Sequence, residues 1–262
     1  MSLIDTHAHY DDHRFDEEFE GGTHGANMKA HSEGVDVIVN IGSSLASSER
    51  SVLLAEKYSF IYAAVGIHPS DAQEIPSSDI DRVLGRIEDL ASHEKVRAIG
   101  EIGFDYHWDG TDPERQAYFV DAQMDIARRI SLPVVIHTRD AMGDTVDLFA
   151  RHPDVTGVLH SFSGSAETAR QLSAKGWYIS FSGPVTYKNA SKVKEAAAIV
   201  PEDKILIETD SPYLPPVPHR GEINYSGFMK HTCQAVADIR GKSFEEMAQI
   251  TSANAKRFFA IK

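Results

Sequence analysis

The residues most able to do chemistry are histidines and carboxylates at the ends of short apolar segments. The first segment, LIDTHAHYDD, places His7 and His9 two residues apart behind an apolar start. Later segments end in further candidates: Glu101, His137, His160 and Asp210. Imidazole nitrogens and carboxylate oxygens are ordinary ligands of divalent cations in proteins. With thirteen histidines in the chain, His7 and His9 alone do not distinguish chance from a site, so the argument depends on where the other candidates fall.

Eight short segments rich in Val, Ile, Leu or aromatic residues are predicted to be strands. They span residues 3–9, 35–42, 60–68, 96–105, 132–140, 155–164, 177–185 and 204–212. Helical patterns lie between them, and two more helices are expected near 226–239 and 244–259. This alternation predicts parallel strands with helical crossovers, and eight of them in 262 residues favour a (β/α)8 TIM barrel forming a single catalytic domain over residues 1–262. A doubly wound open sheet is the alternative.

Two helices carry readable boundaries. Pro113 suits a first helical turn, with Asp112 before it as the cap. Ser165 is expected to cap the helix that Gly176 ends after Lys175.

In such a barrel the active site lies at the carboxyl ends of the strands. The six candidates would converge there. Four imidazoles and two carboxylates in one apolar-walled site would repel one another when protonated, and bound divalent cations would remove this repulsion. Six ligands exceed the three or four of one catalytic zinc, so two metals bridged by a carboxylate are predicted. Zn, Mn, Fe, Co and Ni all suit such ligands. Gly100 and Gly103 beside Glu101 are expected to allow close approach of backbone or substrate.

Other polar and aromatic residues allow two interpretations. His68, at the end of the third strand, is either a structural residue or part of the site, and Arg139 is either a surface ion-pair former or a substrate contact. Tyr106 and Trp108 either line a pocket or pack. Asp11 and Asp12 are assigned to a solvated loop.

The formal net charge of −13 argues against a broad basic surface that follows a nucleic-acid backbone. It permits a phosphate substrate held locally. No signal peptide or bilayer-spanning apolar run is visible, and the lone Cys233 fits a reducing compartment, so we expect a cytoplasmic protein with no membrane association. The oligomeric state stays open, with a monomer plausible.

The motifs DTHAH, GIHP, GEIGFDY, VIHTR, LHSFSG and ETDSPYLPP, in this order, resemble the TatD-type metal-dependent deoxyribonuclease family from residue 3 to the helix containing Asn254. The resemblance implies an amidohydrolase-type TIM barrel with two divalent ions, for which Mg is a further candidate beside Mn, Zn, Co and Ni. It implies the following roles: a first metal on His7, His9, Glu101 and Asp210; a second on His137 and His160 with Glu101 shared; Asp210 and Glu208 for the nucleophilic water; His68 and Arg139 for substrate phosphate.

The chain departs from the family pattern after the eighth strand. The pattern RGxxN followed by a proline-containing stretch is expected there, and the chain reads RGEINYSG. Arg220, Gly221 and Asn224 match, whereas Tyr225, Ser226 and Gly227 do not.

The leading functional hypothesis is a deoxyribonuclease that hydrolyses DNA phosphodiesters, 3′–5′ exonuclease-like and acting on single strands or ends. The first alternative is a metal-dependent hydrolase of a small-molecule ester, lactone, amide or phosphotriester. Many such enzymes bridge their metals with a modified lysine on the fourth strand, where this chain offers Glu101 and has Lys95 only before the strand. The second alternative is a metal-bound scaffold without catalytic activity.

Overall fold

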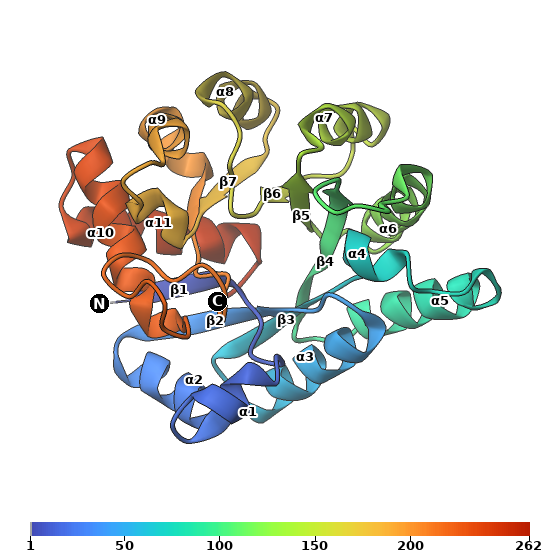
Figure 1. The fold of residues 1–262 in the computed structure, drawn as a ribbon, viewed down its shortest axis with the longest axis horizontal. Helices are drawn as coiled ribbons and strands as arrows, with labels where there is room; N and C mark the ends of the chain where they lie inside the picture. Colours follow the sequence, from blue (N-terminus) through green and yellow to red (C-terminus); the bar gives the residue numbers. More distant parts are fainter. Residues whose placement is uncertain (1) are drawn as a thin grey trace. The chain divides into compact units, whose positions relative to one another are not determined.

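The computed structural model describes residues 2–262, which form eight parallel strands alternating with helices (Figure 1). The strands are β1 (Leu3–Ala8), β2 (Val35–Ile41), β3 (Ile61–Val65), β4 (Val96–Asp105), β5 (Val134–Arg139), β6 (Gly157–Leu159), β7 (Tyr178–Phe181) and β8 (Ile205–Ile207). They belong to one sheet in the order β1 to β8. This sequential order confirms the predicted (β/α)8 fold, because a doubly wound sheet reverses its strand order partway.

The strand boundaries agree best where the strand is long. The predicted strand 96–105 is β4 itself, whereas the predicted strand 155–164 shortens to β6. β6 ends at Leu159 because Ser161 turns to φ +41° and its backbone N–H donates to Glu208 Oε1 at 2.7 Å; one residue further, Phe162 N still donates to Ser180 O of β7 at 3.0 Å. His160 therefore lies on a tight turn after β6 instead of within the strand.

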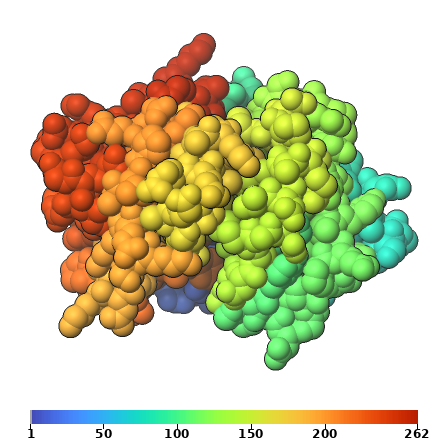
Figure 2. All heavy atoms as spheres, turned by 90° about the horizontal axis from the view of Figure 1, so that it is seen from above, coloured from blue at the N-terminus to red at the C-terminus, as the bar shows by residue number. Residues whose placement is uncertain are grey.

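The described chain divides into two compact units. Among the described residues, the first unit comprises residues 2–40 and 160–262. Its helices are α1 (Arg14–Glu18), α2 (Gly22–Ser32), α8 (Ala166–Ala174), α9 (Ser191–Ile199), α10 (Met229–Arg240) and α11 (Phe244–Phe258), with short 3-10 turns η2 (Gly183–Thr186), η3 (Glu202–Lys204) and η4 (Ser226–Phe228). The predicted helix 226–239 thus begins as η4 and continues as α10. Figure 2 shows the outer surfaces of α8 and α9 side by side.

The first unit also contains the predicted Ser165 cap. Its hydroxyl accepts from Thr168 N at 3.0 Å and starts α8. The helix ends at Ala174, one residue earlier than predicted, and Gly176 follows with φ +96°.

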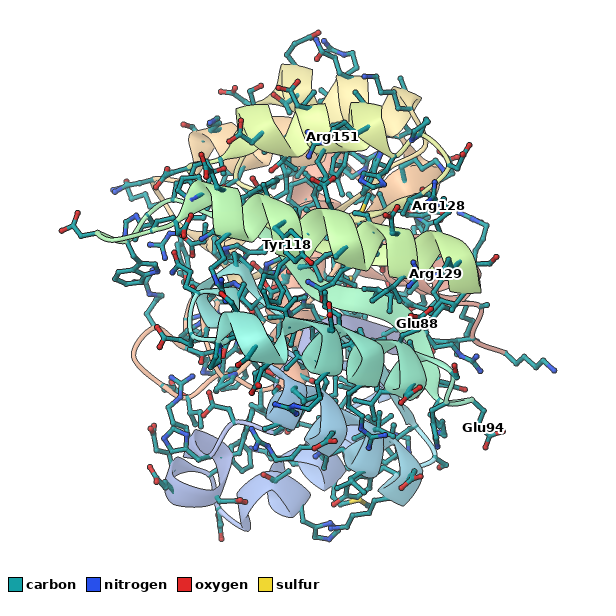
Figure 3. The ribbon with its side chains drawn as sticks, turned by 90° about the vertical axis from the view of Figure 1, so that its right-hand side faces the viewer. Glu88, Glu94, Tyr118, Arg128, Arg129 and Arg151 are labelled. Atoms are coloured by element: carbon teal, nitrogen blue, oxygen red, sulfur yellow. The ribbon has the colours of Figure 1, made fainter. Side chains whose placement is uncertain are left out.

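The second unit comprises residues 41–159. Its helices are α3 (Leu45–Lys57), α4 (Pro69–Ala72), α5 (Ile80–Ala91), α6 (Pro113–Ile130) and α7 (Met142–Arg151), with a 3-10 turn η1 (Ser77–Asp79). The Asp112 cap is confirmed: its side chain accepts from Arg115 N at 3.0 Å and Pro113 opens α6. The outer side of α6 carries Tyr118, Arg128 and Arg129 (Figure 3).

Close contact between β4 and β5 explains the glycines beside Glu101. Gly103 is the register partner of His137, and a Cβ at Gly103 would overlap the His137 carbonyl oxygen. A Cβ at Gly100 would lie 2.6 Å from Cβ of Val135. Gly103 also has φ +139°, which side chains with a Cβ rarely adopt. Of the two expected uses of these glycines, the structure shows the approach of a neighbouring backbone.

Across residues 2–262, none of the helices has the length and apolar character needed to cross a membrane. The assignment of residues 1–262 to a single catalytic domain stays a prediction.

Candidate active site

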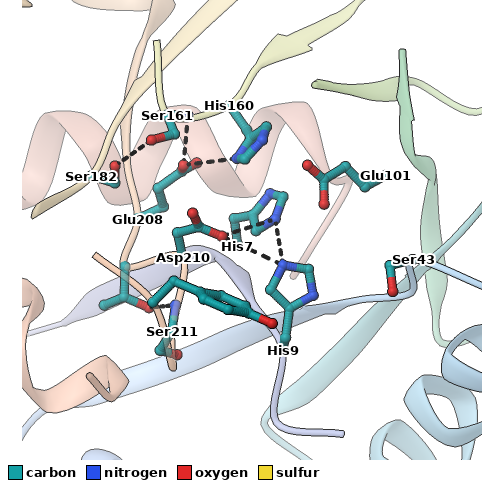
Figure 4. Close-up of polar contacts among 12 residues, drawn as sticks. His7, His9, Ser43, Glu101, His160, Ser161, Ser182, Glu208, Asp210 and Ser211 are labelled. Atoms are coloured by element: carbon teal, nitrogen blue, oxygen red, sulfur yellow. Dashed lines mark hydrogen bonds and ion pairs between the residues drawn. The ribbon is translucent and has the colours of Figure 1, made fainter. Parts of the chain in front are cut away.

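Four of the predicted metal ligands meet in the first unit. His7 lies in β1 and His9 just after it, and their Nε2 atoms are 3.1 Å apart (Figure 4). Asp210, which follows β8, places Oδ1 at 3.7 Å from His7 Nε2 and 3.5 Å from His9 Nε2. The ring of His160 stacks on that of His7 with centroids 4.0 Å apart. Ligand atoms of His7, His160 and Asp210 all lie within 4.8 Å of one another.

A buried carboxylate holds this first cluster in place. Asp5, fully buried in β1, accepts from His7 N at 3.2 Å, from Thr209 N at 3.0 Å and from Thr209 Oγ1 at 2.6 Å. Ser226 Oγ donates to the same carboxylate at 2.6 Å. One carboxylate thereby joins the strand that carries His7 to the segment that precedes Asp210. Asp5 was not among the predicted site residues.

The loop after β8 is held by the matching asparagine of the RGxxN pattern. Asn224 Nδ2 donates to Thr209 O at 3.0 Å and to Tyr213 O at 2.6 Å. Asp210 N donates to His7 O at 2.9 Å. These bonds fix Asp210 in a left-handed conformation, φ +59°, that non-glycine residues seldom adopt without such support.

Glu208, the second carboxylate expected at the nucleophilic water, lies behind His160. It is 1% exposed, its Oε1 accepts from Ser161 N, and the same oxygen is 3.3 Å from His160 Nδ1. A carboxylate beside the second nitrogen of a ligating histidine fixes the orientation of the ring. The geometry therefore connects Glu208 to His160.

Electrostatics keep Asp210 anionic. Burial raises its pKa, but the hydrogen bond from His9 and the charges of His160, His7 and His9 outweigh burial and bring the pKa below its ordinary value. An anionic carboxylate between two imidazoles is suited to binding a cation.

The second unit holds another cluster around His137. His137 Nδ1 lies 2.8 Å from Glu101 Oε1, and its Nε2 lies 3.3 Å from Asp105 Oδ2. His68 Nε2 is 3.9 Å from Glu101 Oε1, and the His68 and His137 rings meet edge to face with centroids 4.5 Å apart. Ligand atoms of His68, Asp105 and His137 lie within 4.8 Å of one another. Predicted ligands Glu101 and His137 are thus joined by His68, which was predicted as a phosphate contact.

Asp105 is a member of this cluster that was not among the predicted site residues. The signal was present, because Glu101 and Asp105 are four residues apart in one strand and so share a face. Burial raises the pKa of Asp105, but hydrogen bonds from His137 and from His107 N, together with the charges of His137 and His68, bring it below its ordinary value.

Asp71 in α4 was also not selected. Burial, together with the charges of Glu101 and Glu74, raises its pKa to about 6. His68 caps the same helix, with Nδ1 accepting from Ser70 N at 3.1 Å. Asp71 therefore adds negative charge near Glu101.

The predicted phosphate contact Arg139 is the exposed last residue of β5. Its guanidinium lies 5.3 Å from the centroid of the Trp108 ring. Arg139, two residues beyond His137 in β5, thus contacts an aromatic side chain from the loop after β4.

The two donor sets fit divalent cations. One unit offers three imidazoles and the Asp210 carboxylate, and the other offers two imidazoles with Glu101 and Asp105. Mixed nitrogen and oxygen ligands of this kind suit Zn and the neighbouring transition metals. When bound, such an ion lowers the pKa of water and polarises a carbonyl or phosphoryl oxygen.

The family model described as TatD related DNase matches residues 4–260. The chain is 41% identical over 261 residues to an uncharacterized metal-dependent hydrolase, YabD of Bacillus subtilis (strain 168), covering 99% of each. It is 35% identical over 265 residues to YcfH of Escherichia coli (strain K12), also an uncharacterized metal-dependent hydrolase, covering 100% of this chain and 97% of YcfH.

Among solved structures, the crystal structure of YjjV, a TatD homologue from Escherichia coli K12, matches with a TM-score of 0.90 at 30% identity. The match covers 99% of this chain and 98% of YjjV. Fold, donor sets and whole-length similarity agree: the chain belongs to the TatD family of metal-dependent hydrolases.

Proposed function

We propose that this hydrolase cleaves phosphodiester bonds of DNA, as a 3′–5′ exonuclease-like enzyme acting on single strands or strand ends. The observation that carries the proposal is the cluster of buried His7 and His160 with partly buried His9 and Asp210, whose ring nitrogens and carboxylate face one another within ion-binding distance. Membership of a family described as related to a DNase supports the choice of DNA.

Two divalent ions are proposed, drawn from Mg, Mn, Zn, Co or Ni. The first would be held by His7, His9, Glu101 and Asp210, and the second by His137 and His160 with Glu101 shared. Asp105, beside the second nitrogen of His137, is proposed to orient that imidazole. When bound, the ions would supply an activated water and stabilise charge on the phosphoryl group.

The protein's own groups have separate proposed tasks. Asp210 is proposed as ligand and proton acceptor, because its anionic carboxylate lies against two imidazoles at once. Glu208 is proposed to act through His160, since both of its contacts are at that turn. His68 and Arg139 are proposed to contact substrate phosphate; Arg139 is exposed and its guanidinium can bind two phosphate oxygens together.

We propose a strand end as the substrate in preference to long duplex DNA because the protein carries a net negative charge. With a net charge of −13, the chain gains little from following many phosphates, whereas a strand end requires few contacts. The alternative of a small-molecule hydrolase is disfavoured because Lys95 is not placed to bridge two metals from the fourth strand. Its Nζ donates to the carbonyl oxygens of Ser59 and Ile61 at the start of β3, so it does not serve as a bridging lysine within β4.

The test uses metal-stripped protein refilled with Mg, Mn, Zn or Co. The substrates are single- and double-stranded DNA with either end blocked, RNA, a lactone and a phosphotriester. We expect turnover of single-stranded DNA with at least one metal and protection by a blocked 3′ end. Absence of phosphodiester turnover with every metal, or preference for the lactone, would overturn the proposal.

His137→Ala provides the test of the site, with His93→Ala as its matched control. His93 pairs with Glu56 through Nε2 at 3.1 Å and lies before β4 begins. We expect His137→Ala to lose activity and bind less metal, and His93→Ala to retain both. Equal behaviour of the two variants would favour the non-catalytic scaffold.

A further inference from the structure

Trp108 is a large aromatic side chain held in an exposed position. It is 58% exposed, in the loop that joins β4 to α6. This loop is tied down: Thr111 Oγ1 donates to Trp108 O at 2.6 Å, and Gln116 binds both Asp105 N and Asp105 O at 2.9 and 3.0 Å. The indole is therefore presented by a fixed backbone.

Two neighbours fix one side of the indole. The Arg139 guanidinium stands over the ring at 5.3 Å, and the His107 ring meets it edge to face with centroids 4.9 Å apart. His107 is in turn held by Asp140, Nδ1 to Oδ2 at 3.2 Å. An aromatic face and a cation therefore lie together. Trp108 is on the loop that follows Asp105, and Arg139 is at the end of β5, which also contains His137.

We propose that Trp108 is the stacking platform for an unpaired nucleobase and that Arg139 binds the phosphate next to that base. The proposal rests on the proposed function and adds the residues that recognise the substrate. An indole stacks on any base, because every base has a π face, and an arginine over the ring contributes a cation–π interaction. A base within a duplex is covered on both faces by its neighbours, so the platform selects unstacked bases.

The acidic character of the chain strengthens the assignment. A protein with net charge −13 cannot draw its affinity from phosphate neutralisation along a strand. Ring stacking supplies affinity without releasing counterions, so binding through Trp108 should depend only weakly on salt. Arg139, whose guanidinium stands over the Trp108 ring, then needs to bind only a single phosphate.

The binding test uses fluorescence and needs no turnover. The chain has two tryptophans, and the other, Trp177, is buried. Metal-stripped protein is titrated with short oligothymidylate and with the same strand carrying an abasic analogue at its terminal nucleotide. We expect the normal strand to quench Trp108 emission and bind about fivefold to a hundredfold more tightly than the abasic strand. Trp108→Ala and Trp108→Phe lack this fluorophore, so their affinities are measured by the fluorescence anisotropy of a dye-labelled strand. Trp108→Ala should abolish the difference between the two strands, and Trp108→Phe should restore most of it.

Tyr118→Ala is the matched control, because Tyr118 is 53% exposed on the outer side of α6 (Figure 3). It should leave both affinities unchanged. In turnover assays, Trp108→Ala should raise KM for normal strands by a similar factor, whereas Tyr118→Ala should leave KM and kcat unchanged both for these strands and for a small aryl phosphodiester.

The outcomes separate the two proposals. If the wild-type protein hydrolyses neither DNA nor the small diester with any metal, the proposed function fails, whatever the fluorescence shows. If it hydrolyses DNA but Trp108→Ala keeps the preference for normal over abasic strands, the platform alone is overturned. A change of oligomeric state in Trp108→Ala, with the base preference kept, would likewise overturn it and assign Trp108 to self-association.

Discussion

The hydroxyl of Ser226 is predicted to stabilise the cluster of His7, His9, His160 and Asp210 through its hydrogen bond to Asp5. Its Oγ donates to the Asp5 carboxylate at 2.6 Å and accepts from Tyr10 Oη at 2.9 Å. Both partners are fully buried. Ser226→Ala removes these two hydrogen bonds while leaving the backbone N–H of residue 226 bonded to Tyr10 Oη.

The size of the effect follows from the two bonds. A hydrogen bond to a charged group contributes about 1.5–3 kcal/mol, and a buried hydroxyl left without an acceptor costs about 1–3 kcal/mol. Because bonds that share one side chain are not additive, about 3 kcal/mol is the expected loss of unfolding free energy. For a chain of this size that lowers Tm by roughly 6–12 °C.

The effect should also depend on pH. Burial raises the pKa of Asp5 to about 6 from its ordinary 3.8, against the lowering effect of hydrogen bonds led by Ser226. Since the folded state binds this proton more readily than the unfolded state, stability falls as pH rises from about 4 to about 6. Removing the hydroxyl raises the folded pKa further, so the fall continues to higher pH. The deficit of Ser226→Ala should therefore be larger at pH 8 than at pH 5.

The assay is thermal and urea unfolding of metal-stripped protein, with Ser173→Ala as the matched control. Ser173, in α8, is also buried, but its Oγ has no hydrogen-bond partner among the described residues. Its removal should be neutral or slightly stabilising, because alanine favours a helix. If Ser226→Ala costs no more than Ser173→Ala, or if its deficit shrinks between pH 5 and pH 8, the assigned hydrogen-bond network is wrong.

Three further predictions concern the second unit. In metal-stripped protein, Asp71→Asn should raise stability at pH 8 by roughly 2–3 kcal/mol and change little at pH 4, because a folded pKa near 6, about two units above the ordinary 3.8, penalises the ionised form; urea unfolding at both pH values checks this. Gly103→Ala should cost about 3 kcal/mol or more, measured by thermal unfolding, since its Cβ meets the His137 carbonyl. Arg129→Ala should cost at most about 1 kcal/mol, and nothing in high salt, because its pair with Glu88 at 2.7 Å is half exposed (Figure 3).

Periodicity was sufficient to predict the fold. Alternating apolar strands and helices located all eight strands in order, and β4 was predicted with its observed bounds. Boundaries failed where hydrogen bonds from distant residues compete with the ladder, as at Ser161, whose N–H donates to Glu208. Local pattern carries no information about such a partner.

Residue type and position at a strand end were sufficient to predict part of the candidate site. His7, His9 and Asp210 were selected because they lie at strand ends, and they do meet. Asp5 was not, because its function depends on donors more than two hundred residues away in sequence. The sequence allows Trp108 either to pack or to line a pocket, and its exposure and its contact with Arg139 in the structure distinguish these interpretations.

Tyr225, Ser226 and Gly227, where the chain departs from the expected family pattern, each make a specific contact in the fold. Ser226 supplies a hydroxyl and an N–H that a proline could not donate, and both are used, by Asp5 and by Tyr10. Gly227 is needed because a Cβ there would overlap the ring of Tyr225, which is itself held by Glu33 through a hydrogen bond of 2.8 Å.

Substituting any one of the three residues should therefore lower the stability of the fold. Gly227→Ala is expected to lower Tm although its site is remote in sequence from every strand, because the buried ring of Tyr225 has nowhere to move. Gly85→Ala, in the open interior of α5, should instead raise stability by about 0.5–1 kcal/mol. A Gly227→Ala protein as stable as Gly85→Ala would show that the loop tolerates the change freely. The requirement for glycine at residue 227 would then be wrong.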